Sequence, residues 1–202
     1  MRIRRFCAIF LIALLAVISS TALAESGWCG DNLSWEKLNG QLGIWGTGPM
    51  YNYSASQSNS DAPWYSRTDV VHLVMDDGPT SIGSYAFGWC MALRDDFTIP
   101  TSVTSIGDHA FCYCHSLNNV TIPSGVRSIG TGCFYRCDGL QSVKIPSGVS
   151  TIRTDTFAHC SSLQKVYMPI TTSVALPTMN EFIANDGTFG GNLLAISLTS
   201  AE

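Results

Sequence analysis

The sequence has few charged residues and no excess of basic ones. Charged side chains make up 13% of the 202 residues, and 11 Lys and Arg are outnumbered by 15 Asp and Glu, which gives a formal net charge of −4. A protein that grips nucleic acid through its phosphates needs a basic surface, so we expect no nucleic-acid partner. After residue 24 no segment approaches the roughly 20 apolar residues of a membrane-spanning helix, and we expect no span there.

The sequence also lacks the motifs of common enzyme classes. It has no nucleophile elbow, no phosphate-binding glycine loop, no His-Glu-x-x-His helix and no paired carboxylates in a supporting context. Asp76-Asp77 and Asp95-Asp96 are adjacent acids at turns, where carboxylates are more often solvated than catalytic. We therefore expect no enzyme activity and no cofactor. A secreted hydrolase whose active site is assembled from distant residues stays an open alternative.

The first 24 residues have the composition of a secretory signal peptide. A basic start precedes an apolar run over residues 6–18 and the small-residue pattern Ala22-Leu23-Ala24. We expect export and cleavage after residue 24, and a chain that is secreted or held at the cell surface.

From residue 70 to 169 the sequence repeats itself with a period of 23 residues, once 24. Each unit carries an isoleucine, a phenylalanine, a cysteine and a leucine in one register, and ends on a strand-like stretch before a proline. The recurring residues are Ile82, Ile106, Ile129 and Ile152; Phe87, Phe111, Phe134 and Phe157; Cys90, Cys114, Cys137 and Cys160; and Leu93, Leu117, Leu140 and Leu163. One unit buries too little apolar surface to offset the ordering of its backbone. The pattern therefore predicts a solenoid of half a unit and four stacked full units.

The segments on either side are expected to cap the repeats. In residues 25–69, strand-like stretches flank Asn39-Gly40, a strong two-residue hairpin signal, so a β-hairpin N-terminal cap followed by a surface loop at 54–60 is predicted. The register fails after Pro169. Residues 170–202 are predicted to form an irregular C-terminal cap with a closing hairpin or strand near 193–198.

Strand alternation predicts which repeat residues face outward. The outward residues form a polar sheet face of two columns: Thr98, Thr121, Lys144 and Tyr167, and beside them Asp96, Asn119, Ser142 and Lys165. A second candidate surface is a ridge made by the residue before each repeat cysteine: Trp89, Tyr113, Arg136 and His159. Aligned aromatic and arginine side chains are typical of binding hot spots. The alternative, that the ridge only shields neighbouring repeats, stays open.

Seven cysteines follow the expected cleavage site, so at least one is unpaired within a monomer. They are Cys29, Cys90, Cys112, Cys114, Cys133, Cys137 and Cys160. Parallel neighbours aim their Cβ atoms the same way, so we expect the four repeat cysteines to be buried thiols, and Cys112–Cys133 is the first pair to check for a disulfide. Short cysteine and histidine spacings resemble a zinc site, but the histidines recur at no fixed position, and no metal is expected.

The unit Ser-Ile-Gly-x-x-Ala-Phe-x-x-Cys-x-x-Leu-x-x-Val-x-Ile-Pro-x-x-Val resembles the BspA-like leucine-rich repeat family of bacterial and protist surface proteins. The stretch from Cys29 to Trp35 also resembles the lead-in that often precedes these repeats. Departures are Cys133 and Thr156 at the alanine position and Arg153 at the glycine position. The resemblance implies a curved parallel-sheet solenoid, extracellular placement and adhesion to host matrix, other cells or glycans. It carries over no catalytic residue.

Taken together, the sequence predicts a β-rich leucine-rich-repeat solenoid with a parallel sheet on one face, acting as a non-enzymatic binding module for an extracellular protein or glycan. The alternative from another class is a structural spacer of the cell envelope without a ligand of its own.

Overall fold

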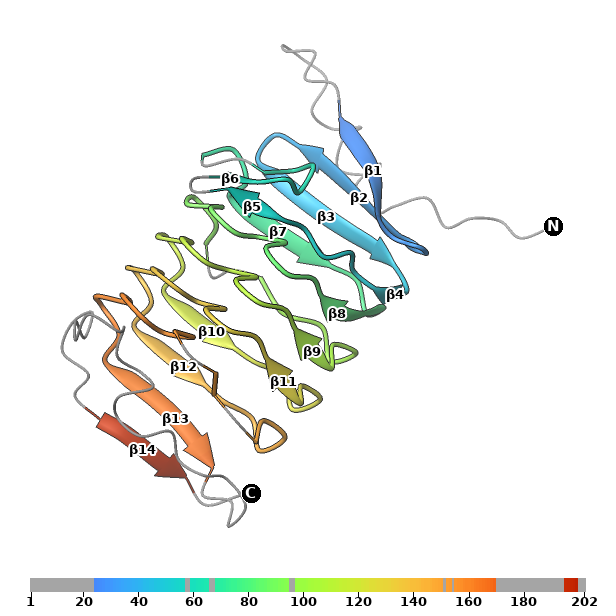
Figure 1. The fold of residues 1–202 in the computed structure, drawn as a ribbon. Coiled ribbons are helices and arrows are strands. Elements are labelled where there is room, and N and C mark those ends of the chain that lie inside the picture. The colour runs from blue at the N-terminus through green and yellow to red at the C-terminus, as the bar shows by residue number, and fades with distance from the viewer. Residues whose placement is uncertain are drawn as a thin grey trace.

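The structure, a computed structural model, describes residues 24–56, 59–65, 68–94, 97–150, 152–153, 155–169 and 195–199. These residues form strands and turns, with no helix among them (Figure 1). Residues 1–23 of the expected signal peptide and most of the expected C-terminal cap lie outside the described residues.

The N-terminal part is a four-stranded sheet in the order β1-β2-β3-β7 (Figure 1). Strands β1 (Glu25–Gly30), β2 (Leu33–Leu38) and β3 (Gln41–Gly46) pair antiparallel, and β7 (His72–Met75) joins β3 in parallel. Asn39 and Gly40 connect β2 to β3 with φ angles of 50° and 81°, the left-handed backbone that a tight hairpin turn requires. The predicted hairpin is confirmed, and β1 extends it by one strand.

A short antiparallel pair occupies the segment for which a loop was predicted. Strands β5 (Ala55–Ser56) and β6 (Asn59–Ser60) have two residues each. Just beyond them the Asp61 carboxylate accepts hydrogen bonds from the Ser54 backbone N–H at 2.7 Å and the Ser54 hydroxyl at 2.6 Å, which closes the loop.

Successive repeats pair in parallel along two ladders, as Figure 1 shows. The first joins β10 (Asn119–Thr121), β12 (Ser142–Lys144), β13 (Lys165–Pro169) and β14 (Ala195–Thr199), and the second joins β4 (Gly48–Pro49), β8 (Pro79–Ile82), β9 (Ser105–Ile106) and β11 (Ser128–Ile129). Both place equivalent repeat residues side by side, such as Val120 with Val143 and Ile106 with Ile129. The sequence predicted the first ladder and not the second, because strands this short carry no alternation pattern.

The first ladder begins at β10 and is not continuous with β7, which pairs with β3 in the N-terminal sheet. Residues 97–100 occupy the corresponding repeat position without forming a strand, in the one unit that is 24 residues long. Ile99 is nevertheless buried, and the Phe97 ring stacks on Phe111 at a centroid distance of 5.8 Å. Apolar packing therefore continues across a gap in the hydrogen-bonded ladder.

The recurring residues form one core. The phenylalanine rings stack from repeat to repeat at centroid distances of 5.2 Å for Phe87–Phe111, 5.6 Å for Phe111–Phe134 and 5.6 Å for Phe134–Phe157. The isoleucine, cysteine and leucine of each unit are also buried. Because Phe111 and Phe134 are each covered by the rings before and after them, the apolar surface of one repeat is buried by its neighbours.

Candidate functional site

Six of the eight sheet-face residues lie on adjacent strands. One row pairs Asn119 with Ser142 and Ser142 with Lys165; the other pairs Thr121 with Lys144 and Lys144 with Tyr167. Ser142 and Tyr167 are half-buried and the other four are exposed, whereas the valines between them, Val120, Val143 and Val166, are buried. The predicted alternation is therefore confirmed on these three strands.

The sheet face offers cationic and hydroxyl groups to a partner. Ser142 Oγ donates to Asn119 Oδ1 at 2.7 Å, which links two strands through their side chains. Among the described residues, neither Lys144 nor Lys165 has a salt-bridge partner. Two unneutralised ammonium groups beside the Tyr167 phenol are suited to a hydroxyl-rich or anionic surface.

The other two predicted sheet-face residues are not part of these rows. Thr98 is exposed but lies in the stretch that forms no strand, and Asp96 lies outside the described residues. The parallel ladder therefore aligns only the sheet-face residues of β10, β12 and β13.

The ridge is more closely packed than the sequence suggests. The Trp89 ring stacks on Tyr113 at 4.9 Å with an interplanar angle of 9°, and on Tyr85 at 6.2 Å with an angle of 17°. Trp89 is only 7% exposed. The expectation that this tryptophan lies on the surface is wrong, because tyrosines lie against its ring. Burial raises the pKa of the Tyr113 phenol.

The C-terminal half of the ridge also packs on itself. The Arg136 guanidinium carbon lies 5.8 Å from the ring centroids of both Tyr113 and Tyr135, and His159 packs edge-on against Tyr135 at 5.2 Å. Tyr135 and Tyr85 lie outside the recurring positions of the repeat, so the sequence pattern did not single them out. The rings in the ridge thus contact one another, which supports the shielding interpretation for its stacked part.

Backbone bonds fix the position of the ridge. The N–H of Trp89 donates to the Cys112 carbonyl at 2.7 Å, and the N–H of Arg136 to the Ala158 carbonyl at 2.9 Å, each in the next repeat. Both donors have left-handed φ angles, 59° and 56°, a conformation that costs a non-glycine residue about 1–2 kcal/mol. The inter-repeat hydrogen bonds offset part of this cost.

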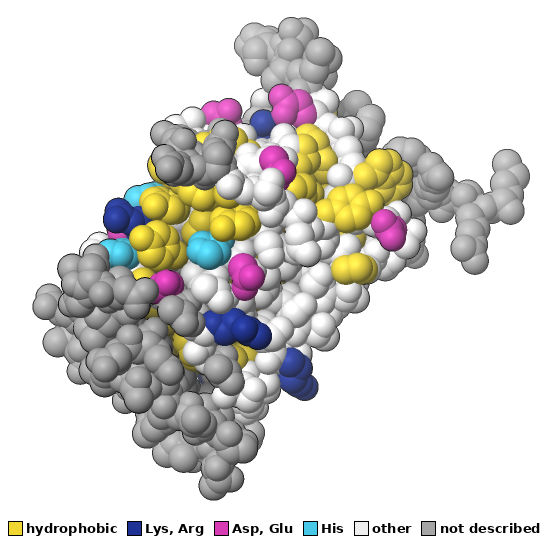
Figure 2. Space-filling model, viewed as in Figure 1, with side chains coloured by type: hydrophobic (Ala, Val, Ile, Leu, Met, Phe, Trp, Pro, Cys, Tyr) yellow, Lys and Arg dark blue, Asp and Glu magenta, His cyan; other side chains and the backbone are white. Residues whose placement is uncertain are grey.

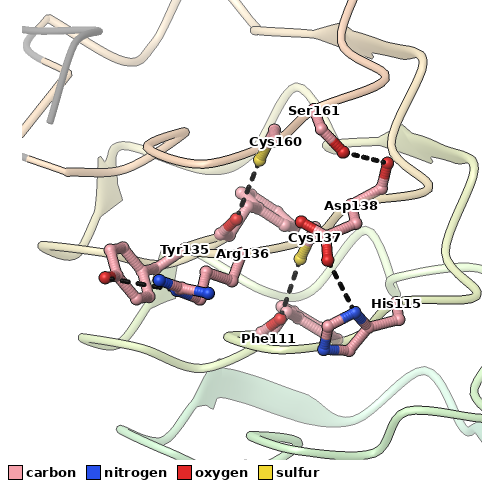
Figure 3. Close-up of polar contacts among 9 residues, drawn as sticks. Phe111, His115, Tyr135, Arg136, Cys137, Asp138, Cys160 and Ser161 are labelled. Atoms are coloured by element: carbon pink, nitrogen blue, oxygen red, sulfur yellow. Dashed lines mark hydrogen bonds and ion pairs between the residues drawn. The ribbon is translucent and has the colours of Figure 1, made fainter. Parts of the chain in front are cut away.

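The repeat cysteines are hydrogen-bond donors within the core. The Sγ atoms of Cys114, Cys137 and Cys160 donate to the carbonyls of the phenylalanines one repeat earlier, at 3.2, 3.0 and 3.0 Å, and Figure 3 shows the last two bonds. All seven described cysteines are buried, and none forms a disulfide. The prediction of buried repeat thiols is confirmed, and Cys112 and Cys133 are thiols as well. Such protonated, enclosed groups fill space and do not act as nucleophiles.

We expect these thiols to resist alkylation in the folded protein. Iodoacetamide reacts with an accessible thiolate. Burial prevents contact with the reagent and also disfavours ionisation of the thiol. Mass spectrometry should find no carbamidomethyl groups on the folded chain and seven after unfolding without a reductant. Rapid modification of the folded chain, or blocked cysteines in the unreduced unfolded chain, would contradict the thiol assignment.

The same thiols predict a loss of stability at alkaline pH. Burial raises the pKa of Cys112 and of Cys160 from about 9 to about 12. Thiols in the unfolded chain therefore ionise first, so the stability gained by burying them is fully present below about pH 9 and is lost as the pH rises towards 12. Urea midpoints should be flat near neutral pH and fall above about pH 9. The Cys112→Ala variant should show a smaller decrease of the urea midpoint above pH 9. A decrease equal to that of the unmodified protein would contradict the assignment of Cys112 as a buried thiol.

A histidine–carboxylate contact joins adjacent repeats beside the ridge. His115 Nδ1 lies 2.8 Å from Asp138 Oδ2 (Figure 3).

In the described part of the chain, no three His, Cys, Asp or Glu residues are grouped so that they could hold a metal ion. The described residues also include no helix long and apolar enough to cross a membrane.

The parallel ladders and stacked apolar columns define a leucine-rich repeat protein. The chain belongs to the family of BspA type leucine-rich repeat regions, whose model matches residues 65–179 in six copies. This confirms the family that the repeat sequence resembles.

Two solved structures share this fold. A leucine-rich repeat protein from Eubacterium ventriosum aligns with a TM-score of 0.57 at 23% identity, over 75% of this chain and 45% of that one. The leucine-rich repeat protein of T. pallidum aligns with a TM-score of 0.55 at 20% identity, over 74% of this chain and 70% of that one. The chain thus spans less than half the length of the Eubacterium protein. No curated protein matches the sequence.

Proposed function

We propose that the chain is an exported, non-enzymatic binding module that holds an extracellular protein or glycan on its sheet face. The observation that carries the proposal is the contrast between neighbouring positions of one strand. Val120, Val143 and Val166 repeat one residue type and are buried. The next position outward changes from Thr121 to Lys144 to Tyr167 on the same backbone register. Outward residues that differ from strand to strand on one fixed backbone register present a specific combination of side chains to a partner, and core packing does not require that variation.

The chemistry of the face supports binding over catalysis. Lys144 and Lys165 offer two cations, Tyr167 an aromatic ring with a hydroxyl, and Asn119 and Thr121 further polar groups. None of these six sheet-face residues is a histidine, the most frequent general acid or base, and none is a cysteine or a carboxylate. The signal-peptide composition of residues 1–24 supports placement outside the cell. In this proposal β1–β3 and residues 170–202 cap the ends of a repeat solenoid.

A binding screen with a face variant tests the proposal. The purified chain is passed over immobilised extracellular matrix proteins and a glycan array, together with the Lys144→Ala, Lys165→Ala, Tyr167→Ala triple variant. We expect the triple variant to bind the captured ligand at least about tenfold more weakly, a loss of about 1.4 kcal/mol. A control variant with Arg127→Ala and Arg153→Ala, which removes two exposed cations away from this face, should bind normally. Equal binding by the triple variant would overturn the face assignment, and no ligand in either panel would favour the spacer alternative.

A further inference from the structure

We propose that the outward side of the N-terminal sheet carries a second binding site, whose ligand is a neutral polysaccharide. Among the described residues the exposed large hydrophobic side chains are Trp28 at 68%, Tyr51 at 44% and Val74 at 38%. All three precede the first full repeat, and in Figure 2 one of the groups of hydrophobic side chains lies over the N-terminal strands, apart from a second group beside the histidines. The four full repeats, where a site was expected from the sequence, hold no large hydrophobic side chain exposed to this degree among their described residues.

Trp28 and Trp45 lie in one row across the sheet. The register pairs Trp28 of β1 with Ser34 of β2, and Ser34 with Trp45 of β3. Their strand neighbours Cys29 and Ile44 are buried, so alternation places the row on the opposite, outward side. Two strand spacings separate the tryptophan backbones by about 9–10 Å, with a serine between them. We call Trp28, Ser34 and Trp45 the tryptophan row.

Core packing does not account for this row. Trp35 and Trp64 are buried and contact each other at 5.6 Å, as expected for residues that stabilise the fold. The Trp45 indole instead lies over Gly43, where a Cβ atom would come within 2.7 Å of Nε1. The Trp45 side chain is half-buried, and its Nε1, itself buried, has no hydrogen-bond partner among the described residues. Gly43 leaves space for the Trp45 indole, and no hydrogen bond from Nε1 to a described residue fixes the position of that indole. The Trp28 side chain is mostly exposed to solvent.

The charges near the row favour a neutral ligand. Glu36 lies on the outward row beside it, paired in register with Ser26 and Gly43. Lys37, on the alternate side of β2, is neutralised by Glu25 at 2.9 Å. An anionic polymer would meet a carboxylate here and no unpaired cation among the described residues of these two rows. Indole rings contact the C–H faces of sugar rings, while nearby serine hydroxyls and a carboxylate bind their hydroxyl groups.

The size and spacing of the patch favour a polymer over a protein. A stable protein interface buries about 1,200–2,000 Å² in total, and one aromatic side chain supplies about 150–250 Å². Two tryptophans and Val74 on an open sheet fall short of that area. Two rings separated by a small residue instead suit a chain of repeating sugar units, which presents one apolar face after another. This site is additional to the proposed sheet-face site and does not depend on it.

Affinity electrophoresis tests the inference with the full chain. Native gels contain mixed-linkage β-glucan, mannan or, as the anionic comparison, polygalacturonate. We expect at least one neutral polysaccharide to slow the protein and polygalacturonate not to do so. Replacement Trp28→Ala should weaken that retardation at least about tenfold, Trp28→Tyr should restore part of it, and a ligand-induced change in tryptophan fluorescence should be lost with Trp28→Ala.

Trp28→Ala is the decisive variant, because the exposure of this side chain means that its replacement leaves the fold intact; Trp45→Ala is a supporting variant. The Lys144→Ala, Lys165→Ala, Tyr167→Ala variant serves as the matched control and should be retarded like the unmodified protein. Failure of both neutral polysaccharides, or retardation unchanged in Trp28→Ala, overturns the inference. Loss of retardation only in the triple variant would assign the polysaccharide to the sheet face instead. Stronger retardation by polygalacturonate would contradict the expected preference for a neutral ligand.

Discussion

Replacing Phe134 by alanine is expected to lower the free energy of unfolding by about 3–5 kcal/mol, the range for deleting a buried aromatic side chain. The Phe134 ring is fully buried and stacks on Phe111 and Phe157 at 5.6 Å on either side. Its removal leaves a cavity between two repeats and uncovers a face of each neighbouring ring. The described repeats share one buried core, so the loss falls on the contacts that hold them together.

Urea denaturation followed by circular dichroism measures this effect. The control is Lys144→Ala, an exposed residue in the same part of the chain, which should change stability by no more than about 0.5 kcal/mol. Similar midpoints for the two variants would mean that the phenylalanine column does not carry the fold.

Trp64→Ala should destabilise the protein by a similar amount, about 3–5 kcal/mol. Trp64 is fully buried, its ring contacts Tyr53 at 5.4 Å and Phe87 at 6.0 Å, and its Nε1 donates to the Ala86 carbonyl at 2.8 Å. One side chain therefore joins the segment before the repeats to the first phenylalanine of the column. Loss of the Trp64 side chain should lower the stability of the N-terminal segment and of the repeats, and should also reduce the coupling between them during unfolding.

A second variant separates packing from the hydrogen bond. Trp64→Phe retains an aromatic ring but leaves the buried Ala86 carbonyl without its donor, and we expect a smaller loss of about 1–3 kcal/mol. Chemical denaturation should give the highest free energy of unfolding for the unmodified protein, a lower one for Trp64→Phe and the lowest for Trp64→Ala. If the alanine variant unfolded like the unmodified protein, the N-terminal segment would not share a core with the repeats.

The recurring part of the fold could be predicted because repetition displays each position several times. Val120, Val143 and Val166 identify the inward side of their strands without any knowledge of the structure. The cysteine slot was found in the same way, since four cysteines share one register. A strand was also predicted near residues 193–198, and β14 pairs there with β13 in parallel.

The surfaces were harder to predict, because exposure depends on what the neighbouring repeat places alongside. Trp89 occupies an outward turn position but is buried by the rings of Tyr85 and Tyr113. The tryptophan row was missed for another reason. It lies in the segment without repeats, and the inward or outward side of Trp28 and Trp45 became clear only from the register of β1, β2 and β3.

The central claim is that the residues of the sheet face that vary between repeats bind the ligand, whereas the residues that recur in every repeat form the core of the fold. The most direct test is a titration that measures the affinity of the captured ligand for a variant whose three sheet-face strands carry the same outward residues. Replacements Ser142→Asn, Lys144→Thr, Lys165→Asn and Tyr167→Thr give β12 and β13 the outward residues of β10 and leave every buried residue unchanged. We predict a free energy of unfolding within about 0.5 kcal/mol per replacement of the original, and ligand affinity reduced at least about tenfold. Undiminished affinity in this folded variant would contradict the claim.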